Sequence, residues 1–178
     1  QMPETELHKA ARDGNLDEIQ GLIADGVNIN EKGAQGRTAL HRALGGGFVE
    51  CAALLIEKGA DPNQSDSLKR TSLHWAAMGP PPGNVECCAL IFAKGDGEVM
   101  LTKTTKSGST PLHSAAGTNR PEVVKFLVEK GADQQAKDED QLTAFDLAKK
   151  NLYSEVLTHL TPPGKAAADG GGGCCTLQ

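Results

Sequence analysis

The sequence has few aromatic residues and no long apolar run. Phe, Trp and Tyr make up only 3% of the 178 residues, so large rings are scarce for a rounded core. No apolar stretch approaches the roughly 20 residues that a membrane-spanning helix needs. The first residues, Gln-Met-Pro-Glu-Thr-Glu, lack the basic and apolar segments of a secretory signal. We therefore expect a protein with neither a signal peptide nor a membrane span.

Concentrated positive charge and a paired set of cysteines are also missing. The chain has 18 Lys and Arg against 23 Asp and Glu, a net charge of −5. Without a Lys/Arg block, nucleic acid is not expected as the main partner. The five cysteines are an odd number and include two adjacent pairs, which argues against a secreted disulfide framework. These features favour an intracellular, cytoplasmic protein.

The sequence does contain an internal repeat. A pattern of Thr, any residue, an apolar residue and usually His begins at Thr5, Thr38, Thr71, Thr110 and Thr143, with intervals of 33, 33, 39 and 33 residues. Self-similarity at such a period indicates a stacked repeat architecture. The longer interval shows that the third unit carries six extra residues.

Each unit is predicted to form two helices. The Thr suits a helix N-cap, and Pro111 after Thr110 suits the first helical turn. Apolar residues at helical spacing mark a second helix. Gly26, Gly59 and Gly131, each 21 residues after its Thr, are expected to end that helix in the left-handed conformation, and Gly95 is the displaced equivalent.

One unit carries the pattern most fully. It runs Thr-Pro-Leu-His-Ser-Ala-Ala over 110–116, Glu-Val-Val-Lys-Phe-Leu over 122–127 and Gly-Ala-Asp over 131–133. This pattern resembles the ankyrin repeat. The resemblance covers residues 4–160 and implies an all-α solenoid of about five repeats, starting near 4, 34, 67, 106 and 139. It also implies a monomeric array that binds other proteins through its hairpin tips and first helices.

The histidines and cysteines of the repeats are expected to be structural. His8, His41, His74 and His113 share one repeat position, and equivalent positions in stacked helices lie about 10 Å apart, too far to share one metal ion. Cys51 and Cys87 occupy a position that is apolar in other repeats, so they are expected to fill the core. With no catalytic signature present, we expect neither an enzyme nor a cofactor or metal.

The resemblance nominates a set of partner-binding residues on the hairpins and first helices. Trp75, the single Trp, could anchor a partner or simply pack between helices, and both interpretations stay open. The extra apolar residues of the third repeat could form an exposed partner site or fold back over the neighbouring repeat. Lys69 and Gln141 replace the usual hairpin Gly, which predicts tips of different shape. The full set is Arg12, Lys32, Arg37, Arg42, Leu68, Lys69, Trp75, Met78, Val99, Met100, Leu101 and Lys106.

The last 18 residues, 161–178, have a different composition. A Gly tract precedes Cys-Cys-Thr-Leu-Gln and predicts a flexible tether. The ending matches a prenylation box whose final Gln favours farnesyl on Cys175, with Cys174 as a candidate palmitoylation site. The alternative is an unmodified tail with incidental cysteines.

Two functional hypotheses follow. The first is a protein–protein interaction scaffold or adaptor, held loosely at a membrane by the lipid on Cys175, since a single lipid gives reversible anchoring. The second is a soluble inhibitor or assembly chaperone that occludes another folded protein, for which the tail has no role. The sequence does not identify the partner.

Overall fold

The computed structural model describes residues 3–81 and 84–164, and this part of the chain is helical, with no strand. The paired helices and a short 3-10 turn are separated by hairpin loops. Their bounds are α1 Glu6–Asp13, α2 Leu16–Ala24, η1 Ala34–Gly36, α3 Ala39–Gly46, α4 Val49–Glu57, α5 Ser72–Met78, α6 Asn84–Lys94, α7 Gly97–Thr102, α8 Pro111–Gly117, α9 Pro121–Glu129, α10 Ala144–Lys150 and α11 Ser154–Leu157.

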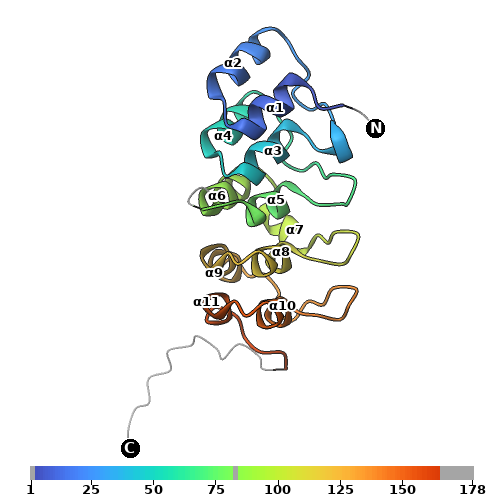
Figure 1. Ribbon diagram of the computed structural model, residues 1–178, viewed down its shortest axis with the longest axis vertical. Helices are drawn as coiled ribbons and strands as arrows, with labels where there is room; N and C mark the ends of the chain where they lie inside the picture. The colour runs from blue at the N-terminus through green and yellow to red at the C-terminus, as the bar shows by residue number, and fades with distance from the viewer. Residues whose placement is uncertain (1–2, 82–83, 165–178) are drawn as a thin grey trace, which may run out of the picture.

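The helices form two parallel columns. The first helices of the repeats, α1, α3, α5, α8 and α10, stack in one column, and α2, α4, α6, α9 and α11 stack in the other (Figure 1). The hairpin loops project from the side of the first helices. This arrangement confirms the predicted all-α repeat solenoid.

Every first helix begins with the same reciprocal hydrogen bonds between Thr and the residue three positions later. In the second repeat, Thr38 Oγ1 accepts a bond from the His41 N–H at 3.3 Å, and the Thr38 N–H donates to His41 Nδ1 at 3.1 Å. This capping box satisfies two orphan donors at the helix start. In the fifth repeat, Asp146 replaces His and accepts from the Thr143 N–H at 3.0 Å.

The Nε2 atom of each imidazole forms a hydrogen bond to the neighbouring repeat. Because Nδ1 accepts a bond from Thr, Nε2 carries the proton and donates. His8, His74 and His113 donate to the backbone carbonyls of Arg37, Ser109 and Leu142, each at 3.0 Å. His41 differs, because it reaches the carbonyl of Gln64 at 3.2 Å. These bonds agree with the structural role predicted for all four histidines.

Left-handed backbone marks the ends of second helices and the hairpin tips. Gly26, Gly59 and Gly131 have φ of +80°, +102° and +88° as predicted, because this region favours Gly. Gly95 is not left-handed, since the chain continues from it into the additional helix α7.

The tips of the third and fifth hairpins, which lack Gly, have the same left-handed backbone as a tip that contains Gly. Lys69 has φ of +60° and Gln141 +61°, close to the +73° of Gly108. The prediction that these tips differ in shape is therefore wrong for the backbone. The backbone of each of these two residues is held in the left-handed region, which costs a non-Gly residue free energy.

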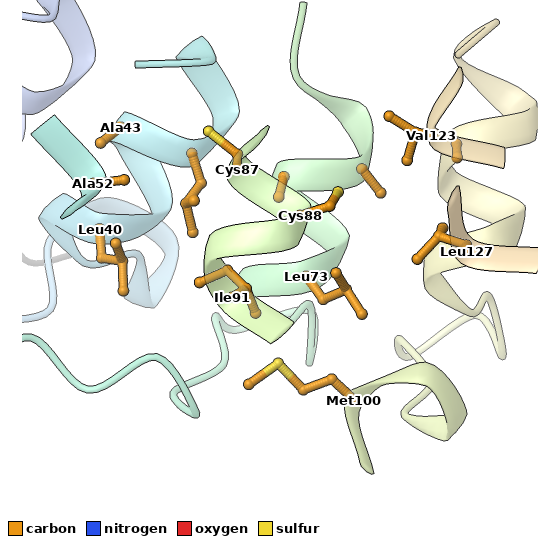
Figure 2. Packing of buried hydrophobic residues seen from close by; sticks show 14 of the residues in the cluster. Leu40, Ala43, Ala52, Leu73, Cys87, Cys88, Ile91, Met100, Val123 and Leu127 are labelled. Atoms are coloured by element: carbon orange, nitrogen blue, oxygen red, sulfur yellow. The ribbon is translucent and has the colours of Figure 1, made fainter. Parts of the chain in front are cut away.

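The core is a thin continuous layer of small and aliphatic side chains between the two columns. Cys87 and Cys88 of α6 are fully buried there, with Ile91 one turn further along the helix (Figure 2). Burial raises the pKa of Cys87 to about 12, and burial also raises the pKa of Cys88 and Cys51. The thiols therefore stay protonated and serve as apolar fillers.

Candidate functional site

The extra segment of the third repeat forms the short helix α7 instead of a loop. Met100 is only 3% exposed and Leu101 8%, whereas Val99 is 54% exposed. The Met100 side chain points from α7 toward Ile91 of α6 (Figure 2), and α7 also contacts α5 and α8. Of the two alternatives left open for these residues, folding back holds for Met100 and Leu101, which complete the core and are not available to a partner, whereas Val99 faces outward.

Trp75 of α5 lies beside arginines of the second and third hairpins, at the centre of a cationic cluster. The guanidinium carbon of Arg37 lies 4.8 Å from the centre of the indole ring, and that of Arg70 lies 4.3 Å from it. Cations over an aromatic face are attracted by the ring quadrupole. Gly45 of α3 makes room for the ring, since a Cβ there would stand 2.8 Å from the indole. Trp75 thus both packs against the previous repeat and presents part of its ring.

Arg70 is fixed by a buried carboxylate. Its Nε donates to Asp66 Oδ2 at 2.7 Å, and Asp66 Oδ1 accepts from the backbone N–H groups of Leu68 and Arg70, each at 2.9 Å. Burial alone would raise the pKa of Asp66, but these hydrogen bonds and the charge of Arg70 outweigh it and hold that pKa below its usual value. The third hairpin therefore contains a charged pair that orients the guanidinium.

Arg42 occupies on α3 the position that Trp75 occupies on α5. It forms an ion pair with Glu4, and the exposed Arg12 lies 3.7 Å from the same carboxylate. Burial lowers the pKa of both Arg37 and Arg42, and the neighbouring charge of Arg70 lowers it further. Three arginines from successive hairpins and first helices therefore lie close enough to influence one another.

A hollow of about 350 Å³ opens between the third and fourth hairpins. Arg70 and Lys106 line it from the two sides, and the backbone N–H of Lys106 donates to the Leu68 carbonyl at 2.9 Å, which joins the hairpins. Side-chain hydroxyls from the fourth hairpin and α8 complete the wall, together with the 45% exposed Leu68. The hydroxyl residues are Thr105, Ser107, Ser109 and Ser114.

Other predicted residues lie around this cluster and not within it. Lys69 is exposed at the tip of the third hairpin, and Lys32 of the second hairpin donates to the Ser65 carbonyl at 3.1 Å. Met78 is half-buried at the end of α5, and Arg12 is held by Asp13 on α1. These residues, and Val99 on α7, make no single site.

The most constrained residue of the cluster, Arg70, was not predicted. A signal for it existed, because Arg70 stands directly before Thr71 as Arg37 stands before Thr38. Asp66, the residue that orients Arg70, is buried.

Other chemistries find little support in the described part of the chain. Across residues 3–81 and 84–164 no three His, Cys, Asp or Glu side chains gather in a way that could hold a metal ion. No helix in those ranges is long and apolar enough to cross a bilayer. Cys174 and Cys175, the predicted lipidation sites, lie outside the described residues.

The same two-helix unit with its Thr capping box thus occurs five times, and a hairpin precedes every unit except the first. A family model described as ankyrin repeats matches residues 7–100, 60–138 and 84–167, which together span most of the chain. The chain belongs to the ankyrin-repeat family. Ankyrin repeats bind other proteins.

Curated relatives share parts of this array. The NAD-capped RNA hydrolase NUDT12 of Homo sapiens is 41% identical over 72 residues, which is 40% of this chain and 14% of the hydrolase. Protein phosphatase 1 regulatory subunit 27 of Homo sapiens is 31% identical over 75 residues, 42% of this chain and 46% of that protein. Alpha-latrocrustotoxin-Lt1a of Latrodectus tredecimguttatus is 39% identical over 62 residues, 34% of this chain and 4% of the toxin. The chain spans less than half of each relative, so the likeness concerns the ankyrin segment.

Proposed function

We propose that this ankyrin array is a non-catalytic adaptor that binds a partner protein across the hairpins and first helices of its second, third and fourth repeats. The observation that carries the proposal is the cluster of Arg37, Trp75 and Arg70, which combines a large ring with two oriented cations. Trp and Arg are the residues most enriched among interface anchors. The buried cysteines and the interlocked histidines supply no exposed nucleophile or base for catalysis.

The experiment is affinity capture from the cells that make the protein, using the intact chain and two variants. Trp75→Ala removes the central ring, and Lys125→Gln changes an exposed residue on the second helix α9 of the opposite column. The proposal predicts that partner proteins captured by the wild type and by Lys125→Gln are lost with Trp75→Ala. Thermal melting of each variant separates lost binding from lost folding. Capture that survives Trp75→Ala and falls with Lys125→Gln would contradict the proposal.

A regulatory role is the second candidate. It is supported by the similarity to protein phosphatase 1 regulatory subunit 27. In this case the array occludes a functional surface of its partner instead of recruiting it. An activity assay of the captured partner, with and without the array, distinguishes the two roles, because an adaptor leaves that activity unchanged.

The membrane tether stays a prediction of the adaptor proposal. A farnesyl group on Cys175, with palmitate on Cys174 as the second signal, would hold the array at an intracellular membrane surface. The intact mass of protein from a prenylating cell tests it, since an unmodified chain that still ends in Gln178 refutes it. Cys175→Ser should release the protein from membranes if the lipid is used and leave its distribution unchanged if the array acts without it.

A further inference from the structure

Positive charge is concentrated on one part of an acidic molecule. The hairpins and first helices of the second to fourth repeats, residues 31–46, 64–78 and 103–117, contain only Glu31 and Asp66 as acidic residues, although the whole chain carries −5. The fifth hairpin reverses the sign, with Asp138, Glu139 and Asp140 in succession. The basic residues of the three segments, called the basic face below, are Lys32, Arg37, Arg42, Lys69, Arg70, Lys103 and Lys106.

The centre of the basic face contains buried donors without acceptors. Nε of Arg37, Nε of Arg42, Nη2 of Arg70 and Nε1 of Trp75 are buried and have no hydrogen-bond partner among the described residues, and the same holds for two acceptors of this region, Oε1 of Glu4 and Oε1 of Gln64. Buried polar groups in folded proteins are almost always paired. The four unpaired N–H donors outnumber the two unpaired acceptors, so the region has donors to spare.

Arg70 is arranged to take one more acceptor. Its Nε is already committed to Asp66, which fixes the plane of the guanidinium, and Arg70 lines the hollow between the third and fourth hairpins. Lys106 supplies a second cation there, and hydroxyl groups of Ser109 and Ser114 can donate from the other side. Charge-assisted bonds from a held guanidinium to a carboxylate are among the strongest in proteins.

We infer that the basic face receives a short acidic segment of the partner protein, with one Asp or Glu carboxylate seated in the hollow beside Arg70 and Lys106. The inference rests on the proposed function and specifies the chemistry of the partner. The flanking residues of the segment pack on the exposed part of Trp75 and on Leu68, which is 45% exposed at the rim of the hollow.

The dimensions and the charge pattern favour a short peptide over a nucleic acid. Stacked helices lie about 10 Å apart, so the second to fourth hairpins span a length that about six extended residues cover. A longer polyanion would continue onto Asp138, Glu139 and Asp140 of the fifth hairpin and be repelled. Apolar Leu68 beside the cations also suits a peptide side chain better than a phosphate backbone.

Two substitutions remove charge from the basic face without damaging the fold. Lys69 has φ of +60°, so Lys69→Gly deletes a cation and relieves the backbone. Lys106 is exposed and its side chain makes no hydrogen bond or ion pair with the described residues, so Lys106→Gln is also tolerated. The matched control is Lys94→Gln with Lys125→Gln, which removes the same charge from the second helices α6 and α9.

The test is fluorescence anisotropy with the full chain and three labelled probes. The first is an eight-residue peptide of alternating Glu and Leu, which in an extended conformation places all carboxylates on one side. The second has Gln in place of Glu, and the third is an eight-nucleotide oligouridylate. The inference predicts that the Glu peptide binds more tightly than both other probes, with affinity that falls as salt is raised.

The variants locate the binding. The Lys69→Gly/Lys106→Gln double variant should weaken the Glu peptide roughly fivefold or more, as expected for two charges at the rim of a site. The Lys94→Gln/Lys125→Gln control should change it less than twofold. The inference is overturned if the Gln peptide binds equally well, if the oligonucleotide binds best, if neither peptide binds, or if both double variants weaken binding alike.

The two proposals fail separately. If captured partners are lost with Trp75→Ala while the Glu peptide shows no preference for the basic face, the array binds proteins there but not through an acidic segment. If the Glu peptide binds the basic face and capture from cells is insensitive to Trp75→Ala, the acidic-peptide site stands and the adaptor proposal fails.

Discussion

Lowering the pH from 7 to 5 should destabilise the array through two buried histidines. Burial lowers the pKa of His41 and of His74 to about 4, compared with the ordinary value of 6.5. Each ring is fully buried and already uses Nδ1 as an acceptor and Nε2 as a donor. A second proton would break the bond from Thr, so the folded state holds the neutral imidazole.

Whether acid raises or lowers the free energy of unfolding depends on which state, folded or unfolded, binds more protons. Between pH 6.5 and about 4 the unfolded chain protonates both histidines and the folded chain does not, so the stability present above pH 6.5 is lost as the pH falls. At about 1.4 kcal/mol per unit of pKa difference, each histidine removes about 2 kcal/mol of unfolding free energy by pH 5. The two together remove about 4 kcal/mol, a large share of the 5–15 kcal/mol typical of folded domains.

Urea unfolding at pH 8, 7, 6 and 5 measures this dependence. The double variant His41→Gln/His74→Gln keeps a capping-box side chain that does not titrate. It should be less stable at pH 8, because the bonds to the next hairpins are lost, but its stability should change far less between pH 7 and 5. The pKa values of Asp66 and Asp146 are lowered, so protonation of these carboxylates reduces the free energy of unfolding only below about pH 4. Equal pH dependence in wild type and variant would show that His41 and His74 do not cause the loss of stability.

Three further predictions concern packing and backbone. Cys87 and Cys88 should react with a thiol reagent at pH 8 only after unfolding, because burial keeps them protonated and covered; rapid labelling of the native protein contradicts this. Lys69→Gly should raise the unfolding free energy by about 0.5–1 kcal/mol, and Gln141→Gly by a similar amount, since both positions are left-handed; a loss of stability in either variant argues against the strain. Met100→Ala should cost about 2–5 kcal/mol if α7 is part of the core, which thermal or urea unfolding measures, whereas a change below 0.5 kcal/mol indicates an exposed segment.

The repeated features could be predicted from the sequence because each is set by local chemistry. A Thr followed three residues later by His, or by Asp146 in the fifth repeat, specifies a capping box, and the five copies place the helices in register. The left-handed Gly26, Gly59 and Gly131 follow from the same local rule. The tips at Lys69 and Gln141 show the limit of that rule, since stacking of the hairpins imposes the conformation on residues that do not favour it.

The individual features could not be predicted because they depend on distances between repeats. The six extra residues of the third unit have no counterpart in its neighbours, and only the space beside Ile91 decides that Met100 turns inward. The cluster of Arg37, Trp75 and Arg70 forms because residues 33 positions apart come to lie on adjacent repeats. Charges summed along the chain hid the basic face, because the acidic residues of the second helices and the fifth hairpin mask it.

The proposed partner docks on the hairpin side of the second to fourth repeats. Site-specific crosslinking tests it most directly, with a photoreactive amino acid placed at Lys106 in one protein and at Lys125 in another, each expressed in the cells that contain the partner. Lys106 lies in the fourth hairpin and Lys125 on α9 in the opposite column. We expect a discrete crosslinked species from position 106 and none from position 125. The same species from position 125 alone, or equally from both, would contradict it.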